Sequence, residues 1–131
     1  MTVDVHGPRL VLAVVGAIFA LMEVADAFLL DVPLLGIAFG LTVAIMTFWL
    51  VRSHSRWPVI GLALLGAFEL FAVIAIYPDA PHPPATWRLA LFGIVSAAVL
   101  ITAGVTLWAG WRATAAPQDG DGPGGGGARA V

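Results

Sequence analysis

The sequence contains no cysteine, no lysine and little charge of either sign. Without cysteine there can be no disulfide, thiolate zinc site, iron–sulfur cluster or catalytic thiol. Only 11% of the 131 residues are charged, whereas 60% are hydrophobic. A soluble domain carries roughly 25% charged residues, which it uses to cover its surface. The composition therefore predicts a single domain that folds in a lipid bilayer, with the bilayer as its first partner.

Several classes of site are missing from the sequence as well. The net charge is −2 and no basic stripe is present, so we expect no nucleic-acid partner. There is no histidine pair at i, i+4, no HExxH motif, no phosphate-binding glycine loop and no evident nucleophile–base pair. We therefore expect no metal, no cofactor and no catalytic residues, and predict that the protein is not an enzyme. Arginine without lysine, with abundant alanine and glycine, indicates a bacterial source.

Four long apolar runs occupy most of the chain, at residues 10–30, 33–51, 57–77 and 87–111. Each is close to or longer than the ~20 residues that cross a bilayer as a helix. Pro33 and Pro58 suit the first turns of helices, and a proline-rich stretch at 78–84 indicates an extended loop. We predict an all-α integral membrane protein, with a four-helix transmembrane bundle in residues 1–112. The glycine-rich residues 113–131 are predicted to be a disordered tail.

The arginines predict the orientation. One side of a four-span chain would hold five of the six, and the other side would hold only Arg88. The five are Arg9, Arg52, Arg56, Arg112 and Arg129. Because cytoplasmic loops carry the excess of basic residues, we expect both termini in the cytoplasm, with the protein in the bacterial cytoplasmic (inner) membrane.

An alternative concerns the first apolar run. Ala25-Asp26-Ala27 has the small-x-small form of a signal-peptidase site, and cleavage there would leave three helices. The apolar run resumes at once with Phe28, and the preceding segment carries one arginine and one aspartate. These flanks favour an uncleaved first helix.

Acidic residues inside the apolar runs are the candidate functional residues. Glu23 and Asp26 lie in the first run, Glu69 lies in the third, and Asp31 lies at the outer rim. At 1.5 Å per residue, Glu23 and Glu69 are roughly 20 and 18 Å from the inner edge of the membrane. The two glutamates are therefore predicted to share one level, with Asp26 one turn further out.

No basic side chain is expected at that depth, since Arg9 and Arg88 fall at the interfaces. A charged carboxylate there costs several kcal/mol, so the acids must be protonated, face a wet cavity, or hold a cation or a partner's basic group. We predict a proton or cation site with Glu23 and Glu69 at its centre. Asp26 and Asp31 would feed it. The alternative is that protonated acids only hydrogen-bond between helices.

Small residues predict where helices pack closely. Gly36, Gly40 and Ala44 would form a smooth ridge on the second helix, Gly16 lies near the face of Glu23, and Gly93 lies on the fourth helix. Packing within one bundle explains them better than a dedicated dimer seam.

Three functions remain open. The first is a proton- or cation-linked transporter or channel, as a homo-oligomer because four helices enclose little volume. The second is a non-catalytic accessory or assembly subunit of a larger membrane complex, in which the acids meet basic groups of other membrane subunits. The third is a membrane enzyme that acts on lipid with Glu23 and Glu69 as acid and base, and its only support in the sequence is that these two acids share one depth.

Overall fold

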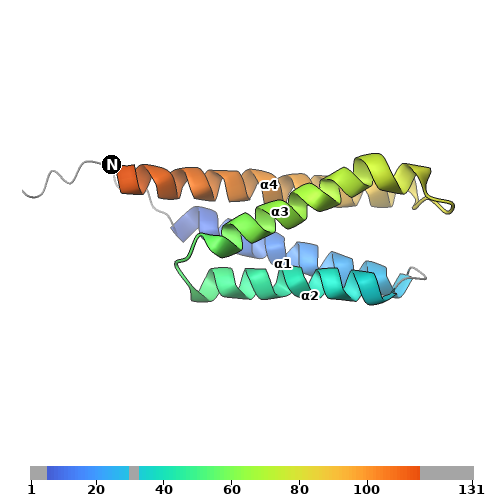
Figure 1. The fold of residues 1–131 in the computed structure, drawn as a ribbon, viewed down its shortest axis with the longest axis horizontal. Helices are drawn as coiled ribbons and strands as arrows, with labels where there is room; N and C mark the ends of the chain where they lie inside the picture. Colours follow the sequence, from blue (N-terminus) through green and yellow to red (C-terminus); the bar gives the residue numbers. More distant parts are fainter. Residues whose placement is uncertain (1–5, 30–32, 116–131) are drawn as a thin grey trace, which may run out of the picture.

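The computed structural model describes residues 6–29 and 33–115, which form four long helices and no strand (Figure 1). The helices are α1 (His6–Leu29), α2 (Pro33–Arg52), α3 (Trp57–Phe71) and α4 (Thr86–Ala115). After α3 the chain continues through a π-helical turn, η1 (Ala72–Ile76), and a 3-10 turn, η2 (Tyr77–Asp79). The predicted all-helical fold is confirmed. The tail predicted to be disordered lies outside the described residues from residue 116 onward, and so does Asp31.

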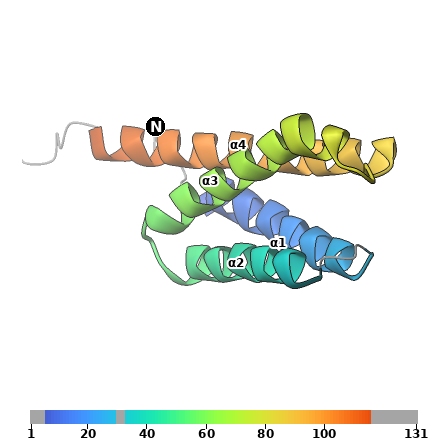
Figure 2. The same cartoon turned by 45° about the vertical axis from the view of Figure 1, so that its right-hand side comes forward.

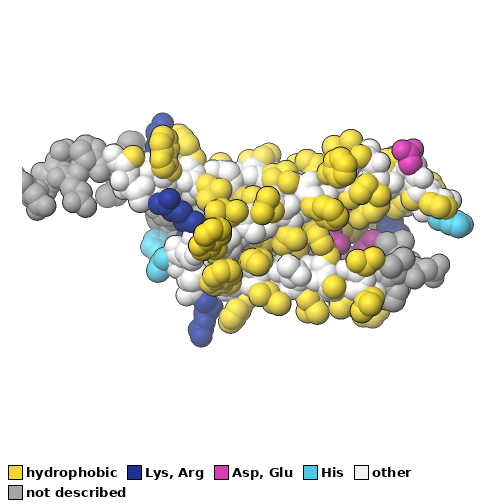
Figure 3. Space-filling model, in the orientation of Figure 1, with side chains coloured by type: hydrophobic (Ala, Val, Ile, Leu, Met, Phe, Trp, Pro, Cys, Tyr) yellow, Lys and Arg dark blue, Asp and Glu magenta, His cyan; other side chains and the backbone are white. Residues whose placement is uncertain are grey.

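All four helices are long and apolar enough to cross a membrane, with α3, η1 and η2 forming one span over Trp57–Asp79. Hydrophobic side chains cover the visible face of the bundle along most of its length (Figure 3). Phe28, Leu34, Ile74 and Trp87 are each at least two-thirds exposed. So large an apolar surface is compatible with lipid rather than water. The prediction of a multi-pass membrane protein is thus supported by length and composition.

Proline and arginine define several of the helix ends. Pro33 is the first residue of α2 and Pro58 the second residue of α3, where a missing amide hydrogen costs nothing. The Arg9 guanidinium donates hydrogen bonds to the carbonyl oxygens of Leu50 (3.1 Å) and Ser53 (2.6 Å). These carbonyls lie at the end of α2, where no amide is left to bond them. We call this end, with loop 53–56, the arginine end, and the end with loop 80–85 the acidic end.

The helices pack unevenly. α1 packs most extensively on α2, α3 packs on α4, and α1 also contacts α4. Of the four helix pairs that pack together, α2 and α3 contact each other least, because α3 crosses away from α2 toward α4 as it approaches the acidic end (Figures 1 and 2). The bundle is therefore more open between α2 and α3 at the acidic end.

The apolar core fills the half of the bundle near the arginine end. Its fully buried side chains come from all four helices and include Leu12, Phe19, Val43, Val59, Leu62 and Val99. Protein interiors pack as densely as organic crystals, so this cluster forms an apolar plug between the four helices.

Glycines bring α2 close to α1. A Cβ on Gly36 would lie 2.7 Å from the Ala27 Cβ, and one on Gly40 would lie 3.2 Å from the Ala20 carbonyl oxygen. Ala44, however, is exposed, so the predicted ridge does not continue through it. Two steps of four residues rotate Ala44 by about 80° from Gly36 on an α-helix.

The buried face of α2 instead continues at Val43 and Thr47. Seven and eleven residues after Gly36 on an α-helix, these side chains point within about 20° of the direction of Gly36. Thr47 meets α1 at Gly16, where an added Cβ would lie 2.6 Å from the Thr47 Oγ1. Gly93 on α4 is less confined, with Val73 at an ordinary contact distance of 3.6 Å.

Candidate functional site

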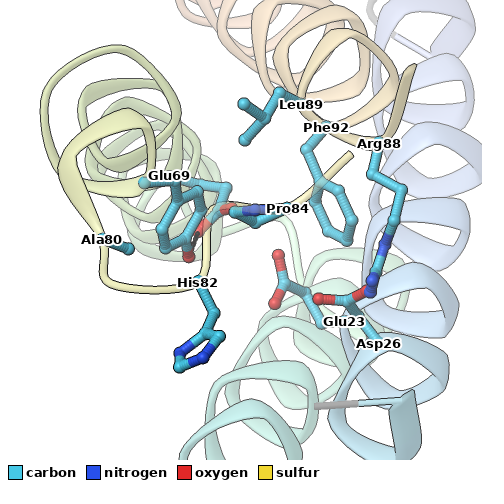
Figure 4. Close-up of a pocket in the computed structure, with 10 residues that line it drawn as sticks. Glu23, Asp26, Glu69, Ala80, His82, Pro84, Arg88, Leu89 and Phe92 are labelled. Atoms are coloured by element: carbon cyan, nitrogen blue, oxygen red, sulfur yellow. Dashed lines mark hydrogen bonds and ion pairs between the residues drawn. The ribbon is translucent and has the colours of Figure 1, made fainter. Parts of the chain in front are cut away.

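Two buried glutamates lie in one cavity near the acidic end. Glu23 on α1 is 7% exposed and Glu69 on α3 is 3% exposed. Both line the same cavity, together with Asp26 (Figure 4). Counting residues predicted that the glutamates share a level, and the packing of α1 against α4 and of α4 against α3 brings them to one place.

Asp26 has a partner that the sequence analysis placed elsewhere. The Arg88 guanidinium, from the first turns of α4, forms an ion pair with the Asp26 carboxylate (Figure 4). Both side chains are less than one-fifth exposed. The expectation that no basic side chain reaches the acids was therefore wrong. An arginine whose backbone lies at the rim can extend its long side chain inward along apolar surface.

Tyr77 is a site residue that was not among those predicted from the sequence. Its hydroxyl donates a hydrogen bond to the Glu69 Oε2 at 3.3 Å. On a regular α-helix, side chains eight residues apart point about 80° away from each other. The π-helical turn η1 takes up one extra residue, so Tyr77 lies roughly where a seventh residue would, on the same face as Glu69.

The first cavity, which we call the polar cavity for the charged side chains in its wall, lies against the loop at the acidic end. Its volume is about 180 Å³. Besides the three acids, Tyr77 and Arg88, its wall includes His82, whose side chain is exposed on loop 80–85 (Figure 4). The buried glutamates thus lie at the inner end of a polar recess that begins at an exposed loop.

The second cavity is larger and mostly apolar, with a volume of about 380 Å³. It shares Glu23, Asp26, Glu69 and Tyr77 with the first, and the rest of its wall comes from apolar residues of α1, α2, α3 and η1. Figure 3, which views the molecule from the side of α2 and α3, shows acidic side chains in a recess between them. The carboxylates are therefore reached from the loop and also from the lipid-facing side.

One carboxylate oxygen in the site is unsatisfied. The Glu23 Oε1 is buried and has no hydrogen-bond partner among the described residues. A buried polar atom without a partner costs about 1–3 kcal/mol, more if the group is charged. A proton on Glu23, or a cation or N–H donor beside it, would remove this cost.

The histidines do not join this site as a group. His6 and His54 lie at the arginine end with their rings edge to face, 6.4 Å between centroids. Within residues 6–29 and 33–115, no three histidine, aspartate or glutamate side chains are arranged to hold a metal ion. Comparison with family models, curated proteins and solved structures finds no match for this chain, so its function is argued from the site itself.

Proposed function

We propose that the protein is a small membrane transporter that binds and releases protons or cations at Glu23 and Glu69. The observation that carries the proposal is the pair of buried carboxylates at the inner end of a polar cavity. One of them has an oxygen without a hydrogen-bond partner among the described residues. Ionisable groups within membrane spans are costly and are therefore functional by default expectation.

The uneven packing favours a transporter over an open channel. The acids are accessible from the acidic end, whereas the apolar plug closes the half near the arginine end. Passage across the membrane would then require the plug to open while the polar cavity closes, which is alternating access around a fixed site.

The arginines support an orientation for this cycle. Arg52 and Arg56 flank the loop at one end of the bundle, and Arg9 bonds to that loop. By the positive-inside rule we propose that this end and both termini face the cytoplasm of a bacterial cell. The polar cavity then faces outward, and a homo-oligomer would supply the volume that four helices lack.

The proposed role is non-enzymatic, although the opening between α2 and α3 would also give a lipid access to the acids. None of the described residues that line the two cavities is a serine or threonine.

The test is proton flux in liposomes that contain the pure protein, under an imposed pH gradient and membrane voltage. We expect flux in the native protein and none above empty liposomes in the Glu23→Gln, Glu69→Gln double variant. The matched control is Asp79→Asn, which removes an exposed acid that lines neither cavity and should leave the flux unchanged.

Absence of flux in the native protein, with and without added cations, would contradict the proposal. It would favour the accessory subunit, in which a basic group of another chain fills the place beside Glu23. Co-purifying membrane proteins would then be the next thing to identify.

A further inference from the structure

The larger cavity has the form of a ligand site that opens toward lipid. Its volume of about 380 Å³ falls in the range of roughly 300–1,000 Å³ that is typical of small-molecule sites. Its outer wall carries Leu35, which is 70% exposed, and Phe68, which is 56% exposed. These side chains lie on α2 and α3, which diverge toward the acidic end, so the cavity is continuous with the lipid-facing surface between them.

The inner wall of this cavity is negative. Glu23, Asp26 and Glu69 all contribute to it. Arg88 is the one fixed positive charge in the described lining of the two cavities, and it is paired with Asp26. An ionised Glu23 or Glu69 therefore has no ion-pair partner among the described lining residues. A positively charged ligand would be complementary to these carboxylates.

Hydrogen bonding narrows the chemistry further. The buried Glu23 Oε1 accepts no hydrogen bond from a described residue, whereas the Glu69 Oε2 already accepts one from Tyr77. An ammonium group that carries hydrogens can donate to the free oxygen, and a quaternary ammonium cannot. A charge-assisted bond of this kind is roughly twice as strong as a neutral one.

Aromatic rings line the apolar part of the same cavity. Phe39 and Phe68 lie with their ring centroids 6.0 Å apart, and both contribute to the wall. They offer a surface to an alkyl chain or ring, whose burial contributes about 0.8 kcal/mol per CH₂ group.

We propose that this cavity binds an amphiphilic amine, which enters from the bilayer between α2 and α3. Its ammonium group donates an N–H···O hydrogen bond to the Glu23 carboxylate. The apolar body of the ligand lies against Phe39 and Phe68. Its ammonium group supplies the positive charge that compensates the carboxylates of the two glutamates. The inference rests on the proposed function, since it names the class of cation that the carboxylates hold.

Photolabelling in lipid nanodiscs tests the proposal. The probes are decylamine, decyltrimethylammonium and decanol, each with a diazirine near the end of the tail, and adducts are located by mass spectrometry. We expect the amine to label α2 and α3 around Leu35, Phe39 and Phe68, several-fold more than the alcohol does. The trimethylated probe should label less than the amine, and excess unlabelled decylamine should compete.

Two variants make the result specific. In Glu23→Gln the labelling by the amine should fall to that by the alcohol, and in Asp79→Asn it should not change. Labelling by the alcohol in Glu23→Gln reports that the cavity is intact. Equal labelling by amine and alcohol in the native protein would overturn the proposal and assign the cavity to lipid tails. Proton flux is measured separately, so a failure of this proposal can be distinguished from a failure of the proposed function.

Discussion

At the scale of single residues, Asp26 and Arg88 depend on each other because both are largely removed from water. Loss of one partner leaves the other as a poorly solvated, uncompensated charge. We expect Asp26→Asn and Arg88→Gln each to destabilise the protein, and the double variant to be more stable than the sum of the two effects predicts. The coupling free energy should be about 0.5–3 kcal/mol.

The measurement is a double-mutant cycle from unfolding of the four proteins in mixed detergent. The same substitutions at Arg112 and Asp79, which are exposed and lie on different elements, serve as an uncoupled pair. A coupling free energy near zero for Asp26 and Arg88 would contradict the role given to their ion pair.

The site could be predicted from the sequence only in part. The level of Glu23 and Glu69 follows from counting residues along two helices that run in the same direction. The contact of Arg88 depends on how far a flexible side chain extends inward, which spacing does not give. The contact of Tyr77 with Glu69 requires a π-helical turn, and nothing in residues 72–76 predicts one.

At the scale of helices, the approach of α2 to α1 depends on Gly40. An added Cβ would lie 3.2 Å from both the Ala20 carbonyl oxygen and the Glu23 Cβ, and 2.7 Å from the Val24 Cγ2. We expect Gly40→Ala to destabilise the protein by about 1–3 kcal/mol, as overpacking commonly does. It should also reduce proton flux, because α1 would shift with Glu23 on it.

Gly104 provides the matched control for this substitution. It also lies within a long helix, but a Cβ there would have no neighbour within 4 Å. Gly104→Ala should therefore be neutral, or stabilising by up to ~1 kcal/mol through helix propensity. The measurement is unfolding in detergent, and equal effects of the two substitutions would show that close packing is not what Gly40 provides.

The helices themselves were predictable, whereas their packing was predictable only in part. Apolar length and the positions of Pro33 and Pro58 were enough to locate the spans. On α2, Gly36 and Gly40 lie close to α1 whereas Ala44 is exposed, because steps of four residues drift around an α-helix. The divergence of α3 from α2 depends on contacts among all four helices, which a pattern within one segment does not contain.

At the scale of the whole molecule, the absence of cysteine makes the orientation easy to test. Ser55→Cys places a thiol in the loop at the arginine end, and Ala85→Cys places one in the loop at the acidic end. On intact bacterial cells, a membrane-impermeant maleimide should label the cysteine at position 85 and should label position 55 only after permeabilisation. The reverse pattern would contradict the proposed orientation and would turn the polar cavity toward the cytoplasm.

The unequal lengths of the helices have a consequence for the surrounding bilayer. α2 has 20 residues and spans about 30 Å, whereas α4 has 30 residues and spans about 45 Å. A hydrocarbon layer of ~30 Å matches α2, so α4 must tilt or extend beyond the layer. Trp108, Trp111 and Arg112, all exposed near the end of α4, suit the headgroup region. The thickness of the membrane therefore affects the tilt of α4 more than that of α2. A change in acyl-chain length can then change the angle between α4, which carries Arg88, and the packed pair α1 and α2, in which α1 carries Glu23.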